Sequence, residues 1–364
     1  MNKIRVHVEK GSSSSYEIHI GTHILDRMAL ILASQAWARR YFLLTDERVF
    51  ALHGGRVLGV LRETGLTVEE IVFPGGEESK SIRTCTELAE QLMERGADRT
   101  SALIALGGGV VGDLTAFLAS IYMRGIAHIQ VPTTILAQVD SSIGGKTAVD
   151  LPSAKNLLGT FTQPKAVFID LAFLETLPPR EFTNGLAEIV KYGIIEDPEI
   201  LEDLQKGEEA LRRRDPSFLA GIIARACRIK KAIVESDEND RGLRRILNFG
   251  HTVGHAIEAE SGFAVSHGEA VAMGMCAAAL LSERRGHLSP PDREKVFSAI
   301  RRAGLPVRIP ASLDPEGILR GLKKDKKKEG EQIRFVLLKK PGLPFVNGGI
   351  PLSLVRETIE ELRA

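Results

Sequence analysis

The first half of the chain alternates short apolar runs with stretches of helical period, and this alternation restricts the fold more than any other feature. Strands that alternate with helices are typical of a mostly parallel sheet covered by helices. The first two apolar runs flank the serine-rich stretch Ser12–Ser15 and predict an initial hairpin. Helices are expected at Leu25–Leu32, Arg48–Glu63 and Ser81–Arg95. The predicted strands are Ile4–Val8, Tyr16–Ile20, Tyr41–Thr45, Thr67–Phe73, Ala102–Leu106, Ile129–Pro132 and Ala166–Asp170.

The second half has a different pattern. After Leu177, Pro178 and Pro179, strand patterns nearly vanish until Ile333–Leu338, and long amphipathic segments replace them. At 364 residues the chain is long enough for two separate cores. We therefore predict an α/β domain over residues 1–178 and an all-helical domain over residues 179–364. No internal repeat is present, and the lysine-rich run 323–328 is the only other low-complexity segment.

Composition excludes several classes of function. The chain has 48 Lys and Arg against 47 Asp and Glu, and the net charge of +1 gives no general field for nucleic acid or an anionic membrane. The most apolar helical stretch, Ala270–Leu281, is too short to span a bilayer, and the amino terminus lacks the apolar segment of a signal peptide. Cys85, Cys227 and Cys276 are widely spaced and odd in number, which argues against a disulfide framework and favours a reducing, cytoplasmic compartment.

A glycine loop follows the predicted strand Ala102–Leu106 and opens a helix. In GGGVVGD, Gly107, Gly109 and Gly112 satisfy G-x-G-x-x-G, which is typical of pyrophosphate-binding loops. Such loops are usually followed, about 20 residues later, by an Asp or Glu that binds the ribose, and this chain has none there. Asp46, at the end of an earlier predicted strand, can take that role. Because a carboxylate there would repel a 2′-phosphate, we expect NAD rather than NADP. The alternative is a tight turn that only packs on the sheet.

Other polar loops carry groups that suit a phosphorylated ligand. Two threonines stand just past a predicted strand, where ligands meet an open α/β sheet. A structural scaffold does not require so many loops with groups that bind anions. A phosphorylated substrate bound beside a dinucleotide explains them. A purely structural hairpin or loop is the alternative interpretation of PGGEESK. The residues concerned are Glu77 and Lys80 in PGGEESK, Thr133, Thr134, Asp140 and Lys146 in VPTTILAQVDSSIGGKTAVD, and the pair Lys155 and Asn156.

The segment LNFGHTVGHAIEAESGFAVSHGEAVAMG (247–274) places three of the nine histidines within 17 residues. If its first part is one helix, Asn248, His251 and His255 share a face, and His267 opens a second, apolar helix. Neutral imidazoles gathered in this way suit a borderline-soft divalent metal such as zinc. The alternative is a set of core or surface histidines that happen to cluster.

Spacing alone does not settle which histidines bind the metal. His251 and His255 have the i, i+4 separation of the H-E-x-x-H motif, but Thr252 stands where that motif has its general base. A catalytic zinc usually takes three protein ligands, so we expect a carboxylate from another segment of the chain to be the third ligand. Glu188 in NGLAEIVKYGII is the best candidate, because apolar neighbours predict that it is buried together with Lys191.

Taken together, these segments closely resemble the 3-dehydroquinate synthase family of the sugar phosphate cyclase superfamily. The resemblance runs from about Asp46 to Leu338. It implies a dehydroquinate synthase-like fold, with an NAD-binding α/β domain and a helical domain that binds metal and substrate. It also implies a site in the cleft between them, bound NAD, zinc or cobalt, and a homodimer. The blocks that carry it are PGGEESKS, GGGVVGD, YMRG, VPTTILAQVDSSIGGKTAVD, KN, FLETLP, NGLAEIVKYG, LNFGHTVGHAIE, HGEAVAMG and DKK before IRFVLL.

The resemblance also implies roles for individual residues. By position, the metal ligands are Glu188, His251 and His267, with His255 on the substrate side. Implied NAD contacts are Asp46, Glu77, Lys80, Gly108, Gly109, Val110, Asp113, Thr133, Thr134, Asp140, Lys146, Lys155, Phe173 and Thr176. Implied catalytic residues are Lys146, Lys191, Arg244, Asn248 and His255. Implied substrate-binding residues are Arg124, Asn156, Lys230 and Lys326, although a solvated surface loop is the alternative for the lysine run.

The implied reaction converts 3-deoxy-D-arabino-heptulosonate 7-phosphate to 3-dehydroquinate and phosphate, in the shikimate pathway. The enzyme would be a carbon–oxygen lyase acting on phosphates that uses catalytic NAD and a divalent metal. Its steps are transient oxidation, phosphate elimination, reduction, ring opening and an intramolecular aldol reaction. Two alternatives stay open. Another sugar phosphate cyclase, of inosose or valiolone type, differs mainly in its pocket, whereas a metal-dependent polyol dehydrogenase gives no reason for the lysines of GGK, KN and DKK.

Overall fold

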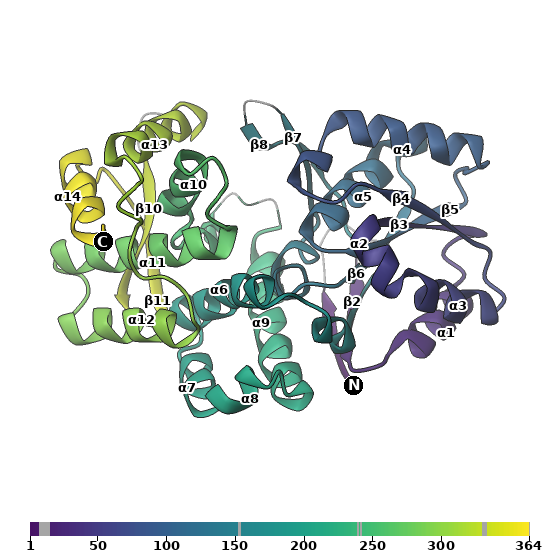
Figure 1. The fold of residues 1–364 in the computed structure, drawn as a ribbon, viewed down its shortest axis with the longest axis horizontal. Coiled ribbons are helices and arrows are strands. Elements are labelled where there is room, and N and C mark those ends of the chain that lie inside the picture. The colour runs from purple at the N-terminus through teal and green to yellow at the C-terminus, as the bar shows by residue number, and fades with distance from the viewer. Residues whose placement is uncertain (7–14, 152–153, 239, 241, 330–332, 364) are drawn as a thin grey trace. The chain divides into compact units, whose positions relative to one another are not determined.

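The computed structural model describes residues 1–6, 15–151, 154–238, 240, 242–329 and 333–363, without the side chains of residues 154 and 324–329 (Figure 1). Contacts divide the chain into two compact units. The first comprises Met1–Pro178 and Arg214–Asn239, and the second comprises Pro179–Arg213 and Asp240–Ala364. The segment Arg214–Asn239 therefore returns to the first unit after the chain has entered the second. The domain limits drawn from the sequence stay a prediction.

A seven-stranded sheet forms the centre of the first unit, in the order β1-β2-β9-β6-β5-β3-β4. β1 and β2 pair antiparallel, whereas the other neighbouring strands pair in parallel. The predicted mostly parallel sheet and its initial hairpin are confirmed, although residues 7–14 lie outside the described part. The strands are β1 (Asn2–Val6), β2 (Tyr16–Gly21), β3 (Arg40–Asp46), β4 (Val68–Phe73), β5 (Ser101–Gly107), β6 (Ala127–Pro132) and β9 (Ala166–Asp170).

Helices cover both faces of this sheet. Successive side chains of β3 point to opposite faces, so Tyr41 and Leu43 pack under α1 and α3, whereas Phe42 and Leu44 pack under α4 and α5. Burial on both faces explains why β5 reads as a continuous apolar run. The helices and short turns are α1 (Leu25–Gln35), α2 (Glu47–Val49), η1 (Phe50–Gly54), α3 (Gly55–Glu63), η2 (Glu77–Ser79), α4 (Ile82–Glu94), α5 (Gly109–Ile121), η3 (Tyr122–Arg124), η4 (Ala137–Ser141), η5 (Leu171–Glu175) and α9 (Pro216–Ser236).

A second antiparallel hairpin, formed by β7 (Lys146–Leu151) and β8 (Ala154–Phe161), is not among the predicted strands. Leu157, Leu158 and Phe161 of β8 are exposed. Because the hairpin does not bury one clean face, its sequence lacks the strict alternation that marks a half-buried strand.

The first unit also gains α9, which was expected in the second half. Arg214, just before this helix, donates hydrogen bonds from Nη1 to the carbonyls of Leu174 and Leu177, at 2.8 and 2.7 Å. The buried face of α9 packs against η4, η5, β1 and β2. Contacts remote in sequence therefore decide which unit holds this helix.

The second unit is helical, as expected, and also carries a two-stranded hairpin at the predicted strand Ile333–Leu338. Its central helix is α11, which is apolar on nearly every side and contacts α6, α10, α12, α14 and β10. The elements are α6 (Pro179–Ile195), α7 (Glu199–Lys206), α8 (Glu208–Arg212), η6 (Leu243–Asn248), α10 (His251–Glu260), α11 (His267–Arg284), α12 (Pro290–Arg302), α13 (Pro315–Glu329), β10 (Arg334–Lys340), β11 (Leu343–Gly348) and α14 (Leu352–Leu362).

The lysine-rich run is helical, and the described helices are too short or too polar to cross a membrane. The backbone of the lysine run 323–328 belongs to α13, so a surface loop is the wrong description of it. Among the described residues, no helix combines the length and the apolar character that a membrane crossing needs.

Candidate functional site

The candidate nucleotide-binding residues gather at the carboxyl ends of parallel strands. β3 ends at Asp46, opposite Phe73 of β4, and β5 ends at Gly107, opposite Pro132 of β6. The loop PGGEESK, the glycine loop and Thr133 follow these strands directly. Loops after neighbouring parallel strands open at one edge of a sheet, which is where open α/β sheets bind ligands.

The glycine loop has the strand–turn–helix form that the sequence predicts. A Cβ atom on Gly112 would lie 2.9 Å from Oε1 of Gln130, so a side chain at this position would displace the Gln130 amide. Gln130 instead donates from Nε2 to the carbonyl of Gly112, at 3.1 Å. No described side chain caps the amino end of α5, which suits an anion at that end.

Lys80 lies at the centre of a polar cluster that joins several of the predicted loops. Its Nζ donates to Oδ2 of Asp113 and Oδ1 of Asn156, both at 2.6 Å. Burial lowers the pKa of Lys80, but the neighbouring carboxylate of Asp113 outweighs burial and raises the pKa, so the side chain is a permanent cation. Lys155 pairs with Glu77 at 3.4 Å. Residues predicted for NAD and for substrate therefore meet in one cluster.

Lys230 enters the first unit on α9 and contacts the carboxylate of Asp140. The lysine is buried, whereas the side chain of Asp140 is 27% exposed, so solvent reaches this ion pair from the carboxylate side only. Arg124 on η3 and Lys146 at the start of β7 are exposed instead. The structure thus unites Lys230 with a predicted NAD contact through a helix that returns from the second half of the sequence.

His53 on η1 is a contact that the sequence did not indicate. Its Nε2 lies 2.8 Å from Oγ1 of Thr176, and its ring packs edge-on to Phe173 at a centroid distance of 4.9 Å. The hydroxyl of Thr176 also donates to the carbonyl of Phe173, at 3.1 Å. Both partners are predicted NAD contacts, whereas His53 stands in an ordinary helical stretch with no motif around it.

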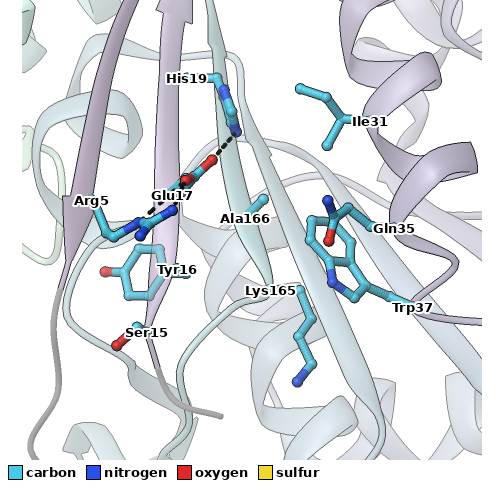
Figure 2. Close-up of a pocket in the computed structure, with 10 residues that line it drawn as sticks. All are labelled: Arg5, Ser15, Tyr16, Glu17, His19, Ile31, Gln35, Trp37, Lys165 and Ala166. Carbon is cyan, nitrogen blue, oxygen red and sulfur yellow. Dashed lines mark hydrogen bonds and ion pairs between the residues drawn. The ribbon is translucent and has the colours of Figure 1, made fainter. Parts of the chain in front are cut away.

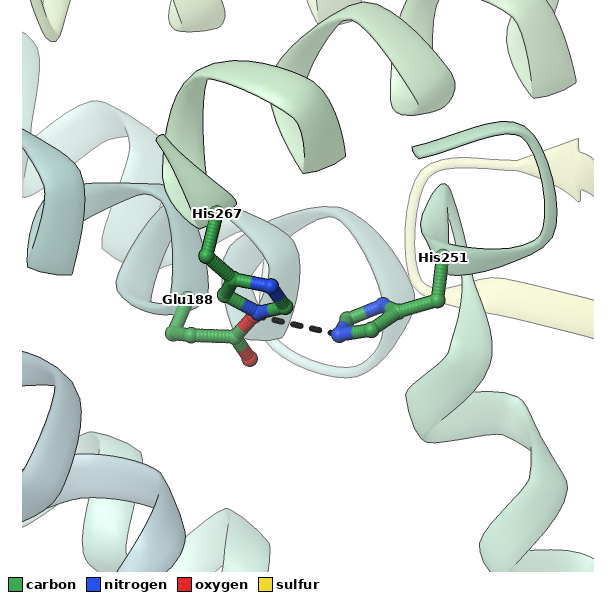
Figure 3. Close-up of side chains that lie close together, drawn as sticks. All are labelled: Glu188, His251 and His267. Carbon is green, nitrogen blue, oxygen red and sulfur yellow. Dashed lines mark ion pairs between the residues drawn. The ribbon is translucent and has the colours of Figure 1, made fainter. Parts of the chain in front are cut away.

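In the second unit, Glu188, His251 and His267 converge from three helices (Figure 3). The Nε2 atoms of His251 and His267 lie 3.4 and 3.7 Å from the same oxygen, Oε1 of Glu188. Ligand atoms of the three side chains all lie within 4.8 Å of one another. One carboxylate and two imidazoles at these separations fit a divalent cation such as zinc.

The carboxylate of Glu188 has no exposed surface, and a buried carboxylate requires positive or polar partners. Lys191, one turn along α6, contacts its Oε2 and is itself buried. The predicted burial of this pair is confirmed. Because Lys191 approaches Oε2, the other oxygen faces the two imidazoles, and the donor set fits a metal at that point.

Close packing of α11 on α6 brings His267 to this group. A Cβ atom on Gly268 would lie 2.1 Å from the carbonyl oxygen of Asn184, so only glycine allows this approach. The first turn of α11 is held by Glu269, whose carboxylate accepts from the N–H and hydroxyl of Ser266, at 2.8 and 2.7 Å. The cap and the glycine together fix the direction in which His267 points.

The two imidazoles differ in their tendency to carry charge. Burial and the ammonium group of Lys191 hold the pKa of His251 well below its ordinary value, so this ring is neutral. Burial also lowers the pKa of His267, but the carboxylates of Glu188 and Glu258 outweigh burial and raise it to about 9. A cation can therefore bind His251 directly, whereas His267 must first release a proton.

The structure corrects one predicted arrangement. The sequence predicts that Asn248 shares a helical face with His251 and His255, but Asn248 ends η6. Gly250 follows with a φ of 82°, a left-handed conformation that separates η6 from α10. His251 and His255 do lie one turn apart on α10, with ring centroids 5.3 Å apart.

The remaining predicted substrate residues of the second unit have different exposures. Lys191 and Arg244 are buried, whereas Asn248 and His255 are exposed. The ammonium group of Lys191 already contacts the carboxylate of Glu188. The side chain of Lys326 lies outside the described residues.

A separate cavity of about 590 Å³ lies beside β1 and β2 in the first unit (Figure 2). Glu17 there pairs with Arg5 at 2.6 Å, and His19 stacks on Phe168 at a centroid distance of 4.9 Å. None of the predicted site residues lines it, so it is not part of the candidate site. Its lining residues are Arg5, Ser15, Tyr16, Glu17, His19, Ile31, Gln35, Trp37, Lys165 and Ala166.

Two family models match consecutive parts of the chain. The model described as 3-dehydroquinate synthase N-terminal matches residues 70–184, and the model described as 3-dehydroquinate synthase C-terminal matches residues 185–328. The chain belongs to the 3-dehydroquinate synthase family. A 3-dehydroquinate synthase from Desulforamulus reducens is 44% identical over 333 residues, which cover 91% of this chain and 92% of the relative. One from Thermodesulfovibrio yellowstonii is 42% identical over 362 residues, which cover 99% and 100%.

Solved structures agree with this family. A 2-deoxy-scyllo-inosose synthase, complexed with carbaglucose-6-phosphate, NAD+ and Co2+, superposes with a TM-score of 0.90 at 28% identity and covers 99% of this chain and 100% of its own. A 2-epi-5-epi-valiolone synthase from Streptomyces hygroscopicus, with NAD+ and Zn2+ bound, has a TM-score of 0.89 at 27% identity and covers 98% and 99%. The predicted family and fold class are confirmed.

Proposed function

We propose that this chain is a 3-dehydroquinate synthase, which converts 3-deoxy-D-arabino-heptulosonate 7-phosphate to 3-dehydroquinate and phosphate. The observation that carries this proposal is the identity of 42–44% with two such synthases over nearly the whole chain. Identity with the inosose and valiolone synthases is 27–28%. The same fold therefore hosts several cyclisations, and the greater similarity is to the dehydroquinate synthases.

We propose that Glu188, His251 and His267 hold one zinc or cobalt ion. The shared approach of both Nε2 atoms to one carboxylate oxygen supports this assignment. Two structural relatives contain Co2+ and Zn2+. When bound, such an ion supplies Lewis acid chemistry, because it stabilises negative charge on substrate oxygens. Three protein ligands leave at least one coordination position for those oxygens.

We propose that NAD lies at the carboxyl edge of the sheet in the first unit, and both structural relatives contain NAD+. Asp46 would accept hydrogen bonds from the ribose, and the amino end of α5 would face the pyrophosphate. The dinucleotide supplies reversible oxidation, so no net redox change is expected. The proposed contacts are Asp46, Glu77, Lys80, Gly108, Gly109, Val110, Asp113, Thr133, Thr134, Asp140, Lys146, Lys155, Phe173 and Thr176.

We propose that cationic side chains anchor the carboxylate and phosphate of the substrate. Charge-assisted hydrogen bonds from lysine and arginine hold such groups in a fixed direction. Fixing both ends of the substrate makes the successive bond changes intramolecular, which lowers their entropic cost. The proposed cationic residues are Arg124, Lys146, Lys191, Lys230, Arg244 and Lys326, and Asn156, Asn248 and His255 are the proposed uncharged polar contacts.

We also propose that the protein acts in the cytoplasm as a homodimer. The family resemblance supports both statements, and the odd, scattered cysteines support a reducing compartment. Sedimentation equilibrium of the purified protein tests the dimer directly, and a mass of one chain at micromolar concentration would contradict it.

The test of the activity uses the heptulosonate phosphate, zinc or cobalt, and substoichiometric NAD. We expect one phosphate released per carbocycle formed, over many turnovers per NAD and without accumulation of NADH. A polyol dehydrogenase would instead reduce NAD stoichiometrically. Glucose 6-phosphate in parallel reactions tests an inosose-type cyclase, which would release phosphate from this sugar and not from the heptulosonate.

A further inference from the structure

Glu258 is a buried carboxylate beside the proposed metal ligands that no role described so far uses. It lies on α10, and only 8% of its side chain is exposed. Its Oε2 lies 3.2 Å from Nδ1 of His267, the first residue of α11. The opposite nitrogen of that ring, Nε2, faces Glu188 at 3.7 Å. The imidazole of His267 is therefore held between two carboxylates.

We infer that Glu258 is a positioning residue for the metal site, and this inference rests on the proposed ligands Glu188, His251 and His267. A carboxylate at this place accepts a hydrogen bond from the N–H at Nδ1, and the lone pair of a neutral ring then resides on Nε2. That nitrogen is the one directed at Glu188. A partner of this kind fixes the tautomer and orientation of a ligating histidine and makes it a stronger base.

The other imidazole has a weaker partner in the same position. Nδ1 of His251 lies 3.3 Å from the backbone carbonyl of Phe249, and its Nε2 lies 3.4 Å from Oε1 of Glu188. Both rings therefore present Nε2 to one oxygen while Nδ1 faces an acceptor. The acceptor is a neutral carbonyl for His251 and a carboxylate for His267, so side-chain substitution can remove only the second.

A competing role for Glu258 is direct ligation. His255, Glu258 and His267 also form a group whose ligand atoms lie within 4.8 Å of one another. A cation there would use Nδ1 of His267, whereas a cation at Glu188 uses Nε2. Burial favours a cation at Glu188, because Glu188 is fully buried and is also approached by the imidazole of His251. His255, which belongs to the other group, is exposed. The two roles predict different losses on substitution.

The experiment measures zinc and cobalt affinity of the full chain by competition with a chelator, together with the visible spectrum of the cobalt form. Removal of an outer partner of a metal-bound histidine typically weakens binding by about 10- to 100-fold. We expect a loss of that size for Glu258→Leu and a smaller loss for Glu258→Gln, because an amide oxygen still accepts from Nδ1. One metal per chain should remain in both. Glu260→Gln, two residues along α10, is the matched control and should bind like the parent.

Several outcomes decide the inference. Parent-like affinity in folded Glu258→Leu would overturn it, and so would a complete loss of stoichiometric metal equal to that of His251→Ala, which would make Glu258 a ligand. If Glu258→Leu does not fold, the isosteric Glu258→Gln decides alone, and unchanged affinity there counts against the inference. A parent protein that binds no stoichiometric metal, or binds it equally after His251→Ala, would instead refute the proposed ligands and not the role of Glu258.

Discussion

At the scale of single residues, His251 and His255 are neighbours on one helix with different surroundings. His251 lies 3.4 Å from the carboxylate of Glu188, whereas His255 is exposed. We therefore expect His251→Ala to lose stoichiometric zinc, and His255→Ala to keep it while turnover falls. The loss of one of three ligands is severe, because a catalytic site has no spare protein ligand. Metal content after dialysis, measured beside the steady-state rate, tests both variants.

The reverse result would refute this assignment. If His255→Ala lost zinc and His251→Ala kept it, the metal would lie in the group formed by His255, Glu258 and His267. Circular dichroism of the metal-free variants serves as the control, because unfolding would also release the ion.

Asp46 combines a structural and a proposed recognition role. Its carboxylate caps the amino end of α2 by accepting from the N–H of Val49, at 2.9 Å. Alanine would remove the cap and the charge together, whereas asparagine caps a helix equally well. We therefore expect Asp46→Asn to keep stability and to reduce the preference for NAD over NADP. Two unit charges 4 Å apart in water repel by about 1 kcal/mol, so the preference should fall roughly fivefold or more.

Binding of both dinucleotides to parent and variant, measured by calorimetry, tests the role of Asp46. A parent protein that binds NADP more tightly than NAD would contradict it. Equal preferences in parent and Asp46→Asn would show that another group excludes the 2′-phosphate.

At the scale of elements, the metal site depends on close contact between α10 and α11. A Cβ atom on Gly274 of α11 would lie 1.9 Å from the carbonyl oxygen of Gly250, which precedes α10. We expect Gly274→Ala to destabilise the protein by about 1–3 kcal/mol, because overpacking forces the two backbones apart. Zinc affinity should fall as well, since His251 and His267 sit at the starts of these two helices.

Gly221→Ala is the matched control for Gly274→Ala. Gly221 also lies within a helix, α9, but a Cβ atom there would meet nothing within 4 Å. Alanine should stabilise this position by about 0.5–1 kcal/mol, because glycine loses more backbone entropy on folding. Urea unfolding measures both changes. A Gly274→Ala protein as stable as the parent would show that the helices can separate without cost.

At the scale of the whole molecule, the proposed substrate contacts come from both compact units. Asn156 and Lys230 belong to the first unit, and Lys191 and Arg244 belong to the second. We expect a phosphonate analogue of the substrate to draw the units together, because its two anionic groups would bind cationic side chains of both units, Lys230 in the first and Lys191 and Arg244 in the second. Small-angle scattering of the NAD-bound protein should show a smaller radius of gyration at saturating analogue. Arg244→Ala should bind the analogue more weakly and close less.

An unchanged radius of gyration at saturating analogue would count against closure. Calorimetry on the same samples establishes that the analogue is bound, and inorganic phosphate serves as the control ligand. Phosphate carries only one of the two anionic groups and should leave the radius closer to that of the ligand-free protein.

Several features of the fold were predictable because they depend on local sequence. Alternation of apolar runs and helical stretches located the strands of the central sheet, and the boundary residues shifted by only one or two. The hairpin of β7 and β8 was missed, because its exposed Leu157, Leu158 and Phe161 break the pattern of a half-buried strand. The prediction that Asn248 shares a helix with His251 was wrong. The left-handed φ of Gly250 ends the preceding turn, and the spacing of polar and apolar residues does not specify that backbone angle.

The family and the α/β and helical halves could be predicted from the sequence, and the family resemblance supplied the residues of the candidate metal site. Those properties follow from local periodicity and from the order of motifs along the chain. Both can be recognised without knowing any long-range contact. Tertiary structure alone decided that α9 joins the first unit, that His53 meets Phe173 and Thr176, and that Glu258 faces Nδ1 of His267. These contacts join residues on different elements. They depend on how closely helices pack, and a spacing along the chain does not specify that distance.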